Sequence, residues 1–310
     1  MRIAMYDNNQ IGVVASDDTV VAVGDLLEQF NPLGPEDLLP DLISNFEQLK
    51  PELATRSERG GGKALGDVKL NSPLTRPTKI VCLIGNYREG TDRPLQILDI
   101  FFKSPEGIVG DGDTVILPPH EASIFHHEAE IAVVIGQPAS NVSRERAMDH
   151  VFGYTVFNDV SARGLGRSGS ASFLGKSFDT FAAFGPWIVT ADEIADPYTL
   201  HVTVEDNGEL RQNYNTSDME RPIDELISYI SAVTPLHPGD VICCGTNHQG
   251  LGAMQDGDTV VTGVSGIGKF TLHVRDPQQR EWERGVDQAM AQQVIAMAQQ
   301  PASGQGGANA

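Results

Sequence analysis

Short apolar segments separated by turn residues make up most of this chain, and the pattern limits the folds that it can adopt. Turns such as Gly110-Asp-Gly-Asp and Asp206-Asn-Gly punctuate the segments. The predicted strands are 79–83, 101–103, 114–117, 127–135, 151–158, 187–190, 200–204, 240–243, 259–264 and 269–274. Helical patterns between them are few, and 223–233 is the clearest. Many strands with few crossover helices predict an α+β, β-rich fold with a mixed or antiparallel core rather than a doubly wound parallel sheet.

The first part of the chain has a different pattern and predicts a small N-terminal α/β domain over residues 1–73. Its expected elements are strands at 1–4, 11–14 and 19–23 and helices at 25–30 and 42–56. A linker at 71–77 leads into a larger, strand-rich domain over 74–276. Residues 277–310 are expected to hold a helix at 285–299 and a flexible tail from Pro301.

The charge balance excludes several classes of partner. The net charge is -20, from 42 acidic and 22 basic residues, so binding to nucleic acid or to an anionic membrane is disfavoured. Three cysteines do not form a disulfide framework, and no apolar targeting segment or membrane-spanning run occurs. We therefore expect a cytoplasmic protein. A small anionic substrate remains possible, because a metal ion and a few cationic side chains can make the electrostatic potential inside a pocket positive despite the negative net charge.

The most informative motif is His126-His-Glu-Ala-Glu130, which runs directly into an apolar strand. Residues two apart on a strand share a face, so Glu128 and Glu130 point the same way. Carboxylates that enter an apolar sheet need neutralising, and a hard divalent cation with oxygen ligands does this. The alternative is an edge strand with both acids in water. The apolar run that follows favours the metal site.

A third acid, Asp159, closes the apolar strand at 151–158, where a rigid element can present a side chain to a site. Arg163 follows four residues later, one turn away if a helix begins there. The alternative interpretation makes Asp159 a helix cap and Arg163 a surface cation. The sequence pattern alone leaves both interpretations open.

Further polar candidates lie in apolar or glycine-rich surroundings. Lys103 and Lys176 are flanked by aromatic residues. In such surroundings a lysine either extends its ammonium past the aromatic rings into water or directs it toward a bound anion. Thr246 lies in a glycine-rich turn, and such turns can expose N–H groups to anionic oxygens. The segment 263–269 resembles the start of a phosphate-binding loop, but Phe270 replaces the required Ser or Thr and the context predicts a hairpin.

Taken together, these segments resemble the fumarylacetoacetate hydrolase family. The matching segments occur in family order at 76–87, 102–105, 126–136, 153–163, 175–180, 207–212 and 238–246. The most specific feature is the Glu128-x-Glu130 pair, followed 29 residues later by Asp159. The resemblance implies a mixed β-sandwich roll with a small N-terminal domain and a homodimer.

The resemblance also implies roles for individual residues. It places Mg²⁺ or Mn²⁺ on Glu128, Glu130 and Asp159, and it directs Lys176, Arg163 and the turn at Thr246 toward the substrate. Lys103, Asn86 and Tyr87 are further substrate-binding candidates.

Two departures from the family pattern concern the water-activating base and the substrate turn. Family hydrolases carry a histidine on a lid segment shortly after the Asn-Tyr pair, whereas this chain has Gly90 there. The turn after Thr246 is longer and contains His248. Among the replacement bases His248 is preferred, with His120 and Glu89 as alternatives. The competing interpretation is that His248 is a solvent-exposed loop histidine without a catalytic role.

The expected activity follows from these groups. The metal would act as a Lewis acid and stabilise the enolate that forms when a 2-oxo acid or a 2,4-dioxo acid is cleaved. With a water-activating base the enzyme would be a hydrolase or lyase of an acylpyruvate-like substrate. Without such a base, the same centre would serve decarboxylation, dehydration or isomerisation. The alternative outside catalysis is a family member that binds metal and ligand without turnover.

Overall fold

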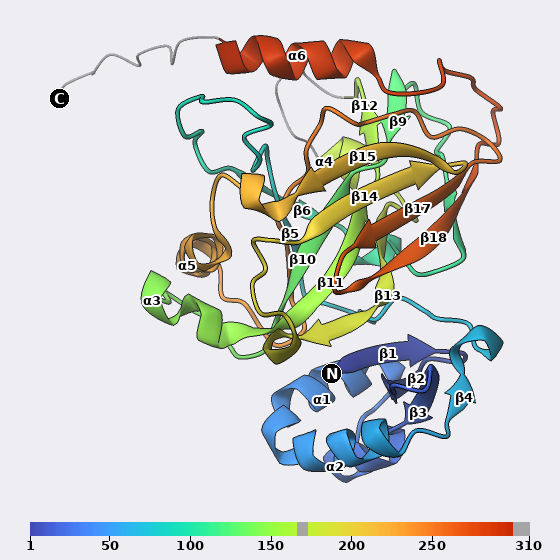
Figure 1. Cartoon of the computed structure of the whole chain (residues 1–310), viewed down its shortest axis with the longest axis vertical. Helices are drawn as coiled ribbons and strands as arrows, with labels where there is room; N and C mark the ends of the chain where they lie inside the picture. Colours follow the sequence, from blue (N-terminus) through green and yellow to red (C-terminus); the bar gives the residue numbers. More distant parts are fainter. Residues whose placement is uncertain (166–172, 300–310) are drawn as a thin grey trace.

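The computed structural model describes residues 1–165 and 173–299, which fold around two facing β-sheets (Figure 1). The larger sheet has eleven strands and is mixed, because β16–β5 and β13–β7 pair in parallel while its other pairs are antiparallel. Its path runs β4 (Lys63–Ala64), β3 (Thr19–Ala22), β2 (Gln10–Val14), β1 (Arg2–Tyr6), β13 (Ala182–Thr190), β11 (Val151–Asp159), β10 (Ala129–Ile135), β16 (Val241–Cys243), β5 (Ile80–Leu83) and β6 (Ile100–Lys103), with β7 (Ile108–Val109) beside β13.

The second sheet packs against β10, β11 and β13 and completes the sandwich. Its five strands are β15 (Glu209–Asn215), β14 (His201–Asp206), β17 (Thr259–Val264), β18 (Gly268–Arg275) and β8 (Asp113–Ile116). Between the sheets lies an apolar core that includes Val133, Val156, Val202 and Leu272, all fully buried. A short ribbon of β9 (Ile124–His126) and β12 (Ser161–Arg163) stands beside them. The predicted β-rich α+β sandwich is confirmed.

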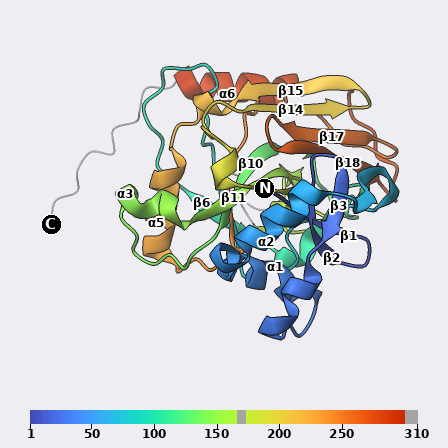
Figure 2. The same ribbon diagram turned by 60° about the horizontal axis from the view of Figure 1, so that its bottom comes forward.

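The helices lie outside the two sheets. They are α1 (Pro35–Ser44), α2 (Phe46–Arg59), α3 (Arg144–Ala147), α4 (Phe173–Lys176), α5 (Ile223–Val233) and α6 (Gln288–Gln299). Short 3-10 turns occur at Gly24–Leu26, Glu28–Phe30, Leu65–Asp67, Pro105–Gly107, Met148–His150, Ala191–Glu193 and Thr216–Asp218. In Figure 2, α1 and α2 come forward with the N-terminal strands, and β14, β15 and β17 form a separate layer above.

The N-terminal helices differ from the prediction. The expected helix over 42–56 is two helices that meet at Asn45, whose φ of -114° and ψ of 17° are not helical. The Asn45 side-chain amide donates to the Asp41 carbonyl at 2.8 Å, which satisfies the end of α1. The expected helix over 25–30 is a pair of 3-10 turns that ends at Asn31 in the left-handed region.

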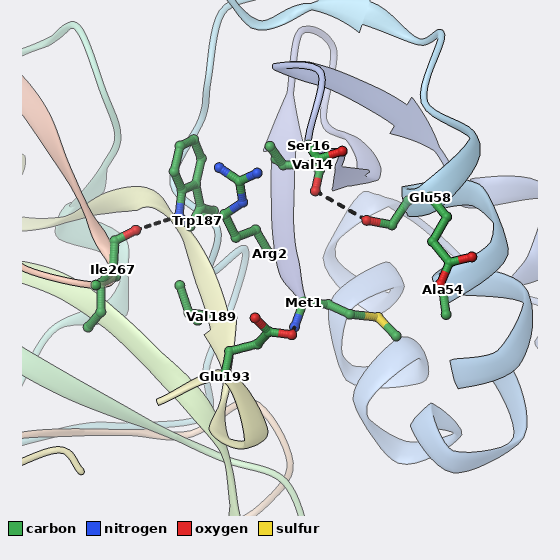
Figure 3. A pocket seen from close by; sticks show the side chains of 12 residues that line it. Met1, Arg2, Val14, Ser16, Ala54, Glu58, Trp187, Val189, Glu193 and Ile267 are labelled. Carbon is green, nitrogen blue, oxygen red and sulfur yellow. Dashed lines mark hydrogen bonds and ion pairs between the residues drawn. The ribbon is translucent and has the colours of Figure 1, made fainter. Parts of the chain in front are cut away.

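The N-terminal strands join the large sheet directly, because β1 pairs antiparallel with β13 through Arg2↔Val189 and Ile3↔Ile188. A cavity of about 600 Å³ lies at this junction (Figure 3). The Arg2 guanidinium lies 5.3 Å from the Trp187 ring beside it. The domain boundary near residue 73 stays a prediction.

Two predicted strands differ from the structure in where they begin. The strand expected at 127–135 begins two residues later, at Ala129, because His127 and Glu128 lie between β9 and β10. The strand expected at 187–190 begins at Ala182, because Pro186 is tolerated where the pairing with β11 is irregular. There Thr155 donates its hydroxyl to the Trp187 carbonyl at 2.9 Å.

Three further sequence predictions concern the second half of the chain. The segment that resembles a phosphate-binding loop is the turn of the β17–β18 hairpin, as predicted. Helix α6 begins three residues later than expected, and the tail from Pro301 lies outside the described residues. Within the described ranges, no helix is long and apolar enough to cross a membrane.

We expect Asp240→Ala to lower the free energy of unfolding by about 3 kcal/mol, since it breaks a buried ion pair. The Asp240 carboxylate is fully buried and accepts from the Thr78 hydroxyl, the Lys79 ammonium and the His237 amide. Urea denaturation measures the change, with exposed Asp67→Ala as the control. Equal stability of the two variants would contradict the prediction.

Candidate metal and substrate site

Three buried carboxylates meet at one end of the central strands. Glu128 immediately precedes β10, Glu130 lies on it, and Asp159 is the last residue of β11. Antiparallel pairing of Glu130 with Phe157 brings the strand ends together. One oxygen from each carboxylate lies within 4.8 Å of the others, and each residue is at most 3% exposed. The structure thus brings together the three predicted metal ligands.

The electrostatics of this group fit a divalent cation. Burial, together with the charges of Asp159 and Glu128, raises the pKa of Glu130 well above its usual range. The three carboxylates therefore resist simultaneous ionisation unless positive charge lies among them. Carboxylate oxygens are the ligands that hard ions such as Mg²⁺ and Mn²⁺ prefer.

Three cationic side chains surround the carboxylates. The Lys176 ammonium donates to Glu128 Oε2 at 2.8 Å and to Asp159 Oδ2 at 2.6 Å. The Arg163 guanidinium bonds to Glu128 Oε1, and the buried Lys103 ammonium bonds to Asp159. Burial alone would raise the pKa of Glu128, but Lys176 and Arg163 outweigh it and hold that pKa below its usual range. Burial would lower the pKa of Lys176, yet Asp159 and Glu128 raise it, so the ammonium stays charged.

A small cavity of about 170 Å³ opens beside the carboxylates. Its described lining combines five of the predicted polar residues with an apolar wall. The polar ones are Glu128, Arg163, Lys176, Thr246 and His248, and the apolar ones include Leu83, Ile84, Phe101 and Ala162. The arrangement suits a small anion held between cations and a metal ion.

His248 forms a dyad with a glutamate from another turn. Its Nδ1 lies 2.7 Å from Glu89 Oε1, and Glu89 is 6% exposed. The Glu89 backbone is held in the left-handed region, at φ 57°, by a bond from its amide to Asp218 at 2.7 Å. Gly90 follows at φ 71°, a conformation in which a histidine would be strained.

This geometry fixes what the dyad can do. Because a carboxylate only accepts, the neutral form of His248 in this contact carries its hydrogen on Nδ1 and has a lone pair on Nε2. His120, the other histidine considered, is exposed and lies against the Phe178 ring instead.

The remaining predicted residues hold the surrounding turns. The Thr246 hydroxyl donates to the Ala129 carbonyl at 2.7 Å. The Asn86 amide donates to the Cys244 carbonyl at 2.9 Å. Tyr87 is fully buried, edge-on to Tyr214 with ring centroids 4.9 Å apart. Neither Asn86 nor Tyr87 belongs to the described lining of the cavity, so their substrate contacts stay predictions.

Two supporting residues escaped the sequence interpretation. Gln212 accepts the Ala129 amide through Oε1 at 3.0 Å and donates to the Thr246 hydroxyl at 2.8 Å, which fixes the turn to β10. Asp287 bonds to His126 at 3.0 Å from the C-terminal segment. Gln212 lies in a segment that resembles the family, but nothing in the sequence indicates its contacts. No sequence signal marks Asp287.

Comparison with known proteins agrees with the fold. The family model for the fumarylacetoacetate (FAA) hydrolase C-terminal domain matches residues 79–275, which contain all three carboxylates. The chain belongs to the fumarylacetoacetate hydrolase family.

Among its relatives, a maleylpyruvate hydrolase of Aquipseudomonas alcaligenes is 34% identical over 294 residues, covering 89% of this chain and 99% of the relative. An oxaloacetate tautomerase of Bacillus subtilis is 38% identical over 225 residues, covering 68% of this chain and 74% of the relative. The solved maleylpyruvate hydrolase of Sphingobium sp. SYK-6, in complex with manganese(II) and pyruvate, is 33% identical with a TM-score of 0.80 and covers 89% of this chain and 99% of its own. The buried carboxylates and this manganese complex support divalent-metal binding here.

Proposed function

We propose that this protein is a divalent-metal-dependent hydrolase that cleaves a carbon–carbon bond in a small acylpyruvate. The observation that carries the proposal is the His248–Glu89 dyad, because its His248 lines the same cavity as Glu128, one of the three grouped carboxylates. The relatives that act on maleylpyruvate support the same substrate class. Mg²⁺ and Mn²⁺ both suit the oxygen ligands, and the manganese complex of the relative favours Mn²⁺ as the first ion to test.

The chain supplies water activation through the dyad. Glu89 accepts from His248 Nδ1 and orients the imidazole, so that Nε2 can take a proton from water. The hydroxide adds to the acyl carbonyl carbon, and the bond to the methylene carbon breaks. The electron pair passes to the departing pyruvate enolate, which takes up the proton held by His248. The products are pyruvate and a carboxylic acid, which ionises by releasing its proton to water. A divalent cation held by Glu128, Glu130 and Asp159 would supply the Lewis acidity that stabilises this enolate.

The cations give the cavity its preference for a 2-oxo acid. Lys176 and Arg163 line the cavity and already bond to carboxylate oxygens of Glu128 and Asp159. A bound cation would draw those carboxylates to itself and free N–H groups for the substrate carboxylate. Lys103 is more deeply buried, where it bonds to Asp159 and to the Val160 carbonyl at 3.1 Å. We assign it to holding Asp159 in place.

Oxaloacetate tautomerisation is the second candidate, because several relatives of 38–43% identity carry that activity. Tautomerisation moves a proton without adding water, so the two activities can be separated. The experiment incubates the Mn²⁺-loaded protein with maleylpyruvate or with enol oxaloacetate and follows pyruvate release and loss of enol absorbance. Stoichiometric pyruvate from maleylpyruvate supports the hydrolase. Enol loss without pyruvate would favour the tautomerase, and no turnover of either would favour a binding protein.

Lys176→Met is expected to lower kcat/KM by roughly 10- to 100-fold, the loss of one charge-assisted contact of about 1.5–3 kcal/mol. Metal affinity should not fall, because the substitution removes a cation from beside the carboxylates. Steady-state kinetics and Mn²⁺ titration measure the two effects, and exposed Lys269→Met is the matched control. A parallel loss of metal binding would show instead that Lys176 is needed to keep the site folded.

Two further predictions about the whole protein stand without a structural test. The homodimer follows from the family resemblance, and the cytoplasmic location follows from the sequence composition. Light scattering of the purified protein measures the first.

A further inference from the structure

The C-terminal segment is connected to the substrate cavity through a buried histidine. His126 is fully buried on β9, between two charged side chains. Its Nε2 lies 3.0 Å from Asp287 Oδ2, and its Nδ1 accepts a hydrogen bond from Arg163 Nε at 3.1 Å. The same guanidinium bonds to Glu128 through Nη2. Asp287, His126 and Arg163 therefore form a continuous chain that ends at the wall of the cavity.

The donors and acceptors in this chain fit only one arrangement. Arg163 Nε–H can only donate, so His126 Nδ1 must be the acceptor. The imidazole hydrogen is then on Nε2, where the Asp287 carboxylate accepts it. Removing the Asp287 carboxylate would leave this buried N–H without a hydrogen-bond partner, which costs free energy. The imidazole could rotate to find another partner, but that rotation would break its hydrogen bond to Arg163.

Asp287 is itself held firmly at the start of α6. Its amide donates to the Leu251 carbonyl at 2.7 Å, and its Oδ1 accepts from the Met290 amide at 3.1 Å. Val286 pairs with Gly252 beside it. The segment thus contacts the chain just after His248 through Leu251 and Gly252, and it contacts β9 through His126.

We propose that Asp287 is a positioning residue that acts through His126 to orient the Arg163 guanidinium for the substrate carboxylate. The inference rests on the proposed role of Arg163 in substrate binding. It makes the segment before α6, far from the carboxylates in sequence, a determinant of substrate affinity. Asp287 does not touch the substrate.

The test compares three single variants, and one double variant that combines Asp287→Ser with Arg163→Met, in the full-length, Mn²⁺-loaded protein. Asp287→Ser retains a side-chain oxygen that can cap α6 but does not reach His126. Arg284→Ala is the matched control, since it removes a contact of the same segment with Asp258 and leaves His126 alone. Arg163→Met removes the group that is to be positioned. The Kd for pyruvate, KM and kcat for maleylpyruvate, and the affinity for Mn²⁺ are measured for each.

We expect Asp287→Ser to weaken pyruvate binding and raise KM by about tenfold with a smaller change in kcat, and Arg284→Ala to change neither. In the Arg163→Met background, Asp287→Ser should have no further effect, because the positioned group is gone. A tenfold effect that persists in that background would overturn the proposal in favour of general loosening. Normal pyruvate binding in Asp287→Ser, when Arg163→Met is impaired, would overturn it while leaving the proposed function intact. Normal pyruvate binding in Arg163→Met would overturn the role of Arg163 in substrate binding. It would also overturn the positioning role of Asp287, which depends on Arg163.

Discussion

Glu130→Gln is expected to reduce Mn²⁺ affinity by more than about 100-fold and to remove activity with it. Loss of an outer-shell partner of a metal ligand typically costs 10- to 100-fold in affinity, so loss of a charged ligand should cost more. Glu130 Oε2 accepts the Gly245 amide at 2.7 Å, a bond that the glutamine oxygen can retain. The variant should therefore fold. Isothermal titration with Mn²⁺ and the maleylpyruvate assay measure the two losses.

The same variant makes a prediction for the metal-free protein. Burial and two neighbouring carboxylates oppose the charge on Glu130, so a neutral isostere should leave thermal stability unchanged or raised without metal. Exposed Glu106→Gln is the matched control. A lowered melting temperature in the metal-free state, with Mn²⁺ binding intact, would mean that Glu130 is structural and not a ligand.

His248→Ala is expected to lower acylpyruvate hydrolysis by roughly 10²–10⁴-fold, the usual contribution of a general base. Metal affinity should stay the same, since His248 bonds to Glu89 and not to the three carboxylates. Glu89→Gln should cause a smaller loss, because an amide oxygen can still accept from Nδ1 but lacks the charge that stabilises the imidazolium. His120→Ala, on an exposed histidine, is the control. Hydrolysis that survives His248→Ala would require another base.

The ratio of two activities makes this prediction more specific. Enol oxaloacetate conversion needs no added water, so His248→Ala should depress hydrolysis more than tautomerisation. Equal losses in both activities would point to a role for His248 in holding the cavity open rather than in activating water.

The grouping of Glu128 with Glu130 could be predicted from the sequence because the relevant pattern is local. Side chains alternate along an extended chain, so the Glu128–Glu130 spacing predicts a shared face, even though Glu128 lies just before β10. Ala132 and Val134, at the following alternate positions of β10, belong to one buried apolar cluster with Cys82 and Phe101. The ends of helices were harder to predict. The break at Asn45 depends on a single residue leaving helical geometry.

The dyad and the Asp287 contact depend on how distant turns meet. His248 and Glu89 are 159 residues apart, and His126 and Asp287 are 161 apart. No periodicity or spacing in the sequence relates such positions. His248 could be proposed as a base because its turn is longer than the family pattern, but Glu89 could be proposed only as an alternative base and not as the partner of His248. Gly90 likewise indicates that the lid histidine of family hydrolases is missing, but it does not indicate which residue replaces that histidine.

A crystal structure of the protein soaked with Mn²⁺ and pyruvate tests the central claim most directly. We expect one Mn²⁺ on Glu128, Glu130 and Asp159, the pyruvate carboxylate against Lys176 or Arg163, and His248 Nε2 facing the open side of the ligand. The His248–Glu89 contact should persist in that complex. Mn²⁺ bound elsewhere, or His248 turned away from the pyruvate, would contradict the account.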